Sequence, residues 1–97
     1  MEPRTLVLAV GGRITRADIP GLCERARMAL ECSDAALVTC DVGAITDPDV
    51  VTVDALARLQ LTARRQGHVI RFRHAGRELR DLLGLAGLGD VVGSGSD

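Results

Sequence analysis

The stretch CDVGAITDPDVVTVDAL, residues 40–56, carries an apolar run directly into the clearest helical pattern of the chain. It holds three closely spaced carboxylates, those of Asp41, Asp47 and Asp49. Three interpretations are open at this point: the carboxylates form an active site, they belong to a phosphorylation switch, or they serve only to cap a helix.

The helix itself is predicted over residues 47–67. Asp47 is a candidate N-cap, and Pro48 suits the first helical position because its missing N–H has no partner there anyway. Gly67 suits the C-terminal cap, where a left-handed conformation is common. Capping and the helix dipole account for Asp47 and Asp49, each contributing about 0.3–1 kcal/mol.

The remaining segments alternate between strand and helix patterns. Strands are predicted at 5–10, 36–42 and 68–74, with a short last one at 90–92. Helices are predicted from about Asp18 to the Ser33-Asp34 break and over 76–89. This order predicts an α/β domain with an about four-stranded, mostly parallel sheet and right-handed crossovers. Residues 1–92 are predicted to form the single domain, and 93–97 a flexible tail.

Two predicted strands alternate in polarity. Arg71 and Arg73 flank Phe72, and Thr39 and Asp41 alternate with apolar neighbours. A parallel sheet covered on both faces is continuously apolar. The alternation therefore predicts helices mainly on one face, with the other face partly wet.

Composition excludes several function classes. Twelve basic residues, all arginine, stand against thirteen acidic ones, giving a net charge of -1 and no field that attracts nucleic acid or a membrane. With one phenylalanine and no other aromatic residue, a base-stacking platform is absent. No membrane-length apolar run or signal peptide is visible, so we expect a soluble cytoplasmic protein. The three cysteines are expected to be reduced and buried.

No catalytic constellation emerges from the residue types. Aspartates at a strand end hold Mg²⁺ in response-regulator receivers, but those domains also use a lysine, and this chain has none. His68 and His74 lie near no nucleophile motif, and Gly11-Gly12 opens no phosphate-binding loop. We therefore expect no enzyme, cofactor or metal site. A Mg²⁺-dependent phosphoryl-transfer protein is kept as the class-level alternative.

Several motifs together resemble STAS domains, the fold of bacterial anti-sigma-factor antagonists. VGGRIT (10–15) matches the turn after the first strand, and ADIPGLCERARMAL (17–30) matches a helix with an early proline. ELRDLLGLAGLGDVV (78–92) matches the closing leucine-rich helix, with Ala86-Gly87-Leu88 in place of T-G-L. The resemblance covers residues 5–92 and implies a regulator of transcription that acts by partner switching.

In that family, a D-[ST]-[ST]-G loop before the long helix carries the serine that a partner anti-sigma factor and kinase phosphorylates. Here Asp47 keeps the aspartate, Pro48 replaces the first hydroxyl residue, Asp49 takes the acceptor position and Val50 replaces the glycine. The resemblance thus implies a domain without the usual acceptor. Thr46 is the candidate substitute acceptor.

Two hypotheses follow: a non-switching protein-binding module, or an antagonist locked in one state by its carboxylate. The expected partner is an anti-sigma factor or serine-kinase-like protein. The predicted partner surface consists of Asp47, Pro48, Asp49, Val50 and Val51. An accessory STAS subunit of a transport or signalling complex is the alternative.

Two further surfaces are open to interpretation. The first strand is predicted to be an unprotected sheet edge, which favours a homodimer or a docking surface. Basic side chains also gather in the third predicted strand and the turn that follows it, at Arg71, Arg73, His74, Arg77 and Arg80. They form either a solvated face or a patch for an acidic partner or an anionic head group.

Overall fold

The computed structural model describes residues 4–35 and 37–88 of the 97-residue chain. The elements are β1 (Thr5–Gly12), the 3-10 turn η1 (Arg16–Asp18), α1 (Ile19–Glu31), β2 (Leu37–Ile45), α2 (Val50–Arg64), β3 (Ile70–Arg73) and α3 (Arg77–Leu85). The predicted alternation of strands and helices is thereby confirmed.

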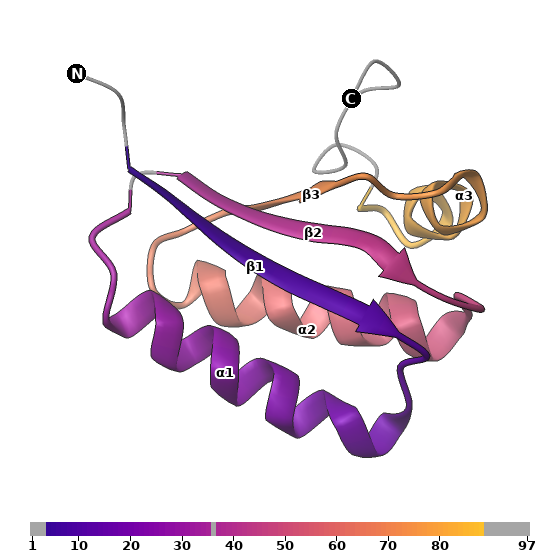
Figure 1. Cartoon of the computed structure of the whole chain (residues 1–97), viewed down its shortest axis with the longest axis horizontal. Helices are drawn as coiled ribbons and strands as arrows, with labels where there is room; N and C mark the ends of the chain where they lie inside the picture. Colours follow the sequence, from indigo (N-terminus) through magenta and orange to yellow (C-terminus); the bar gives the residue numbers. More distant parts are fainter. Residues whose placement is uncertain (1–3, 36, 89–97) are drawn as a thin grey trace.

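The strands form one parallel sheet in the order β1-β2-β3, and α1 and α2 make the two crossovers (Figure 1). The described part of the sheet has three strands, not the four predicted. The fourth predicted strand, at 90–92, and the predicted tail, at 93–97, lie outside the described residues. β1 is an edge strand of the described sheet, as the sequence predicted.

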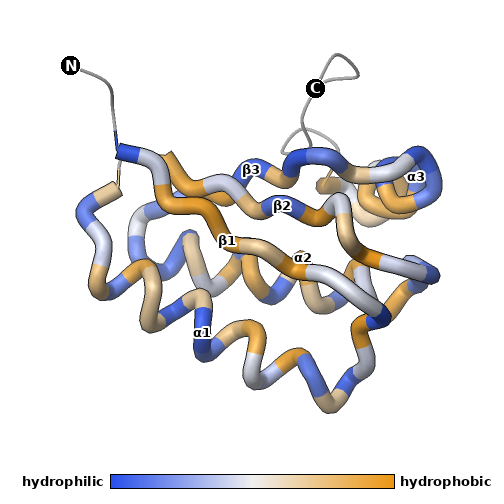
Figure 2. Tube along the Cα trace, in the orientation of Figure 1, coloured by the Kyte–Doolittle hydropathy of each residue, from blue (hydrophilic) through white to orange (hydrophobic). Residues whose placement is uncertain are grey.

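The two faces of the sheet differ as the alternation predicted. In β3, Ile70 and Phe72 are buried while Arg71 and Arg73 are exposed. The same alternation runs through β2, and hydrophobic and hydrophilic residues are mixed along both strands (Figure 2). The helices α1 and α2 lie together on one face of the sheet (Figure 1). We call the opposite face, which carries Arg71 and Arg73, the open face.

The core lies between the sheet and the helices. It contains Val10, Val38, Cys40, Val42, Leu56, Leu59, Ala63, Ile70, Phe72 and Leu83, among others. Among the described residues, the polar side chains of Thr52 and Gln60 are also buried. The Gln60 amide donates to the Ile70 carbonyl at 2.8 Å and accepts from the Ile70 N–H at 2.7 Å. Gln60 therefore satisfies both backbone groups at the first residue of β3, where burial would otherwise leave them unpaired.

Gly67 ends the turn after α2, as predicted. It has a positive φ of 79°, and the His68 N–H donates to the Ala63 carbonyl at 2.9 Å. Together with the bond from the Gly67 N–H to Arg64, this is the Schellman arrangement that requires a left-handed residue.

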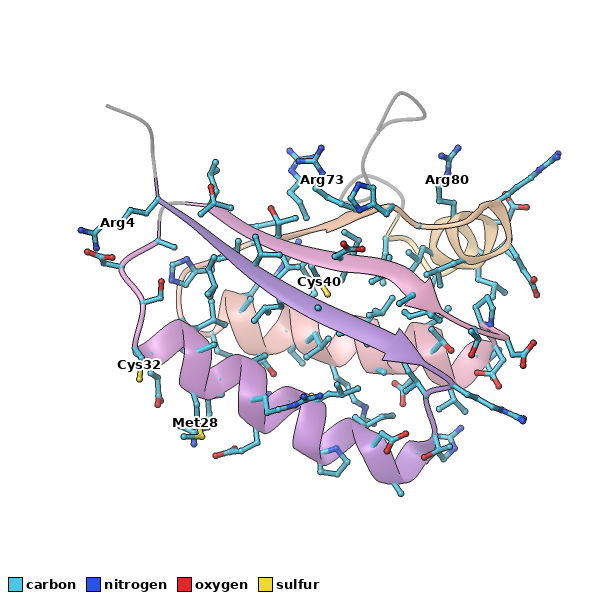
Figure 3. The ribbon with its side chains drawn as sticks, viewed as in Figure 1. Arg4, Met28, Cys32, Cys40, Arg73 and Arg80 are labelled. Carbon is cyan, nitrogen blue, oxygen red and sulfur yellow. The ribbon has the colours of Figure 1, made fainter. Side chains whose placement is uncertain are left out.

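The cysteines do not behave alike. Cys40 is fully buried in the core between the sheet and the helices (Figure 3), and burial raises the pKa of its thiol to about 12. Cys23 is half-buried, but Cys32, the C-cap of α1, is exposed, so its predicted burial was wrong. The reason is that α1 ends at Glu31, so Cys32 lies beyond the apolar stripe of the helix.

Candidate partner-binding site

Residues 47–51, which we call the elbow, connect the end of β2 to the first turn of α2. β2 runs to Ile45, three residues beyond the predicted end of this strand. The next residue, Thr46, donates its N–H to the Gly12 carbonyl at 3.1 Å and so ties the start of the elbow to the end of β1. The elbow thus lies at the carboxyl edge of the parallel sheet, where ligands of open α/β sheets bind.

Asp49, not Asp47, is the N-cap of α2. The Asp49 carboxylate accepts hydrogen bonds from the Val51 N–H at 3.0 Å and the Thr52 N–H at 3.1 Å. In return, the Thr52 hydroxyl accepts from the Asp49 N–H at 3.2 Å, which completes a capping box. The helix therefore begins at Val50, and the assignment of the cap to Asp47 was wrong.

Asp47 has a different structural role. Its φ of 48° places it in the left-handed region, which aspartate tolerates better than most residues, while an N-cap needs extended backbone. Pro48 follows with its φ fixed by the ring. A left-handed residue, a proline and a doubly bonded cap together make the elbow a pre-organised loop.

The elbow is accessible to a partner. Asp47 and Asp49 are exposed, and Val50 is 71% exposed although it is a large apolar residue. Pro48 and Val51 are half-buried, and Val51 packs against the core. The elbow thus presents two exposed carboxylates and the exposed side chain of Val50, while Pro48 and Val51 are partly covered.

Asp41 does not belong to this group. It lies inside β2, where its carboxylate accepts from the Gly43 N–H at 2.9 Å and lies 3.3 Å from Nδ1 of His74. The bond from Gly43 and the bond from His74 both lower the pKa of the Asp41 carboxyl. Asp41 was grouped with Asp47 and Asp49 because the predicted strand ended at residue 42, three residues before β2 actually ends.

Thr46, the candidate substitute acceptor, and Thr52, another hydroxyl residue near Asp49, differ in exposure. Thr46 is exposed just before the elbow, so its hydroxyl is accessible. Thr52 is fully buried, at the third helical position, with its hydroxyl engaged in the capping box. Thr52 is therefore not available as an acceptor.

Neither a metal cluster nor a spanning helix is found in the part of the chain that the structure describes. No three His, Cys, Asp or Glu side chains converge within residues 4–35 and 37–88 in a way that could hold a metal ion. Over the same residues, no helix combines the length and the apolar character needed to cross a membrane.

Comparisons with known proteins bear on the family and on the fold. The family described as "Mlab, STAS domain" matches residues 1–93. Among solved structures, the anti-sigma factor antagonist SpoIIAA in its unphosphorylated form is similar to this chain, with a TM-score of 0.69 and 13% identity. The match covers 98% of this chain and 84% of SpoIIAA, and at this identity it shows the fold alone. No curated protein sequence matches the chain.

Proposed function

The chain belongs to the STAS domain family, and on this premise we propose that it is a non-catalytic, cytoplasmic protein-binding regulator of the anti-sigma-factor-antagonist type. Its partner is an anti-sigma factor or serine-kinase-like protein, and the elbow is the contact surface. A homodimer through the free edge of β1 is part of the same proposal.

The observation that carries the proposal is the position of Asp49 and the hydrogen bonds of its carboxylate. Its carboxylate lies at the N-terminus of α2, held by two backbone N–H groups, at the position that the family resemblance assigns to the phosphorylated serine. A phosphoserine carries about 1.5–2 negative charges and a carboxylate carries one. Asp49 therefore supplies part of the charge of a modified residue, permanently and without a kinase.

Two forms of the proposal differ in what the partner requires. If the partner recognises the carboxylate, Asp49 is a contact residue and the chain is a dedicated binding module. If the carboxylate repels an anti-sigma factor, the chain is a locked antagonist, and a hydroxyl at this position restores binding. The prominent exposure of Val50, next to Asp49, supports a protein contact in either form.

The test is affinity capture from native extract with three baits: the wild type, Asp49→Ser and Asp49→Asn. Asparagine is as good an N-cap as aspartate and removes only the charge, so it separates recognition of charge from helix capping. A partner bound by the wild type and lost with both variants identifies a binding module. A kinase-like anti-sigma protein captured only by the variants identifies a locked antagonist.

The proposal fails if the three baits capture the same proteins, because Asp49 then has no part in recognition. It also fails in both forms if a kinase phosphorylates the chain stoichiometrically, since the acceptor would then lie elsewhere. Phosphorylation of the Thr46→Ala variant would then test whether Thr46 is that acceptor.

A further inference from the structure

The open face of the sheet combines an apolar part and a basic part. Pairing of β1 with β2 places Val7 beside Thr39 and Thr5 beside Leu37. Val7 is 61% exposed and Leu37 is 52% exposed, so both large apolar side chains contact water. They lie on neighbouring strands, two residues apart in register, and form one apolar surface near the amino ends of β1 and β2.

The basic part lies on β3. Arg71 pairs in register with Thr39, and Arg73 pairs with Asp41, so both arginines share the face of Val7 and Leu37. Both are exposed, and Arg73 stands away from the helices α1 and α2 (Figure 3). Among residues 4–35 and 37–88, neither arginine forms an ion pair, although Asp41 is the neighbour of Arg73 across the ladder.

The contacts of Asp41 lie on the side of Gly43 and His74, not of Arg73. Its Oδ1 accepts from the Gly43 N–H and lies near Nδ1 of His74. Two guanidinium groups on one strand thus face solvent with their hydrogen-bonding capacity available. Carboxylates match that capacity best, because the planar guanidinium binds them through two parallel hydrogen bonds.

Among the described elements, α1 and α2 both lie on the other face of the sheet, whereas parallel sheets occur mostly in folds whose helices cover both faces. We infer that the open face is a second docking surface, filled by an acidic amphipathic helix of a partner protein. The apolar side chains of this partner helix cover Val7 and Leu37, and the carboxylates of the helix pair with Arg71 and Arg73. This surface is separate from the elbow, and its use does not depend on the function proposed for the elbow.

An anionic membrane fits this face less well. A lipid surface spreads its negative charge evenly, so Asp41, next to Arg73 in register, opposes it. The chain as a whole carries a net charge of -1 and offers no broad positive field. A helix with carboxylates placed only opposite the arginines avoids Asp41.

The test places a photo-crosslinker, p-benzoylphenylalanine, at Val7 of the full chain in its native cells. The control places it at Leu61, an exposed apolar residue of α2 with a similar exposure of 51%. We expect a covalent protein adduct from position 7 and not from position 61. Peptide mapping of the adduct is expected to find a segment with helical apolar periodicity that carries Asp or Glu on its flank.

Charge variants complete the test. R71E/R73E is expected to reduce the adduct at least tenfold, while R64E/R65E, which reverses two exposed arginines at the C-terminal end of α2, leaves it unchanged. If R71E/R73E does not keep the wild-type melting temperature, R71Q/R73Q replaces it. The inference is overturned if position 7 yields no more adduct than position 61, if the adduct is a lipid or a second copy of the chain, or if both charge pairs reduce it equally.

Discussion

The capping role of Asp49 gives a prediction whose size follows from the structure. Asp49→Ala removes an oxygen acceptor for the N–H groups of Val51 and Thr52, and it removes a negative charge from the positive end of the α2 dipole. Loss of an N-cap costs about 0.5–2 kcal/mol and loss of the charge about 0.3–1 kcal/mol. We expect Asp49→Ala to lower the free energy of unfolding by about 1.5 kcal/mol.

Asp49→Asn and Asp49→Ser keep a capping oxygen and lose only the charge, so we expect a decrease of about 0.3–1 kcal/mol for each, smaller than that for Asp49→Ala. Asp47→Asn is the matched control. It removes a neighbouring charge but keeps a side chain that tolerates the left-handed conformation, and it breaks no cap. Its free energy of unfolding should equal that of the wild type within a few tenths of a kcal/mol.

The assay is urea unfolding followed by far-UV circular dichroism, because the chain has no tryptophan or tyrosine to report by fluorescence. With a denaturant slope of about 1.3 kcal/mol/M, the Asp49→Ala midpoint should fall by about 1 M. The reasoning is refuted if this midpoint stays within about 0.2 M of the wild type, or if Asp47→Asn loses as much as Asp49→Ala.

Three further predictions test other parts of the structure. Gln60→Leu leaves the buried N–H and carbonyl of Ile70 unpaired and should cost about 2–4 kcal/mol in the same urea assay. Cys40, whose thiol has a pKa raised to about 12, should resist iodoacetamide at pH 8 in the native protein, while the exposed Cys32 should be alkylated. Mass spectrometry of the peptides measures the extent of alkylation at each cysteine. The Asp41 carboxyl should titrate below its ordinary pKa in a carbon-detected NMR titration. Because its folded pKa is lowered, its contribution to stability is present above the unfolded pKa and is lost as the pH falls through the folded one.

Much of the fold was visible in the sequence because the strongest local signals agreed with the tertiary packing. Gly67 ends the turn after α2 as its position predicted, and the alternation around Phe72 correctly placed one face of β3 in the core. The fourth strand, at 90–92, remains a prediction. The Gln60 contact was not foreseen, since a polar residue beside Leu59 resembles an exposed helix position until β3 is placed against it.

The end of β2 was misjudged because Gly43 looks like a strand terminator. In the structure Gly43 lies in a tightly packed place: a Cβ there would lie 3.1 Å from Cβ of His74, closer than most such contacts. A Cβ at Gly11 would likewise lie 2.8 Å from Cβ of Ala44, its partner across the ladder. These glycines allow neighbouring chain segments to pack closely. From the local sequence alone, a glycine with this role cannot be distinguished from a glycine that ends a strand in a turn.

The choice between Asp47 and Asp49 as the cap could have been made from the sequence. A capping box needs a side chain three residues after the cap that accepts from the cap's own N–H. Asp49 has Thr52 at that position, and Asp47 has Val50, which cannot accept a hydrogen bond. Pro48 favoured the earlier cap because proline suits the first helical position, but in the structure it precedes the cap at Asp49.

The cap also limits how Asp49 can act on a partner. Its Oδ1 is committed to two backbone N–H groups, so a partner can contact chiefly Oδ2, and any cation that binds there competes with no existing bond. Charge recognition at the elbow is therefore compatible with an intact helix. If the chain is a dedicated binding module, Asp49→Asn should weaken partner binding without unfolding α2. An elbow partner that needed both carboxylate oxygens would have to break the cap. Affinity capture and the urea midpoint, both measured on Asp49→Asn, therefore distinguish recognition of the Asp49 charge by a partner from the capping of α2 by the same side chain.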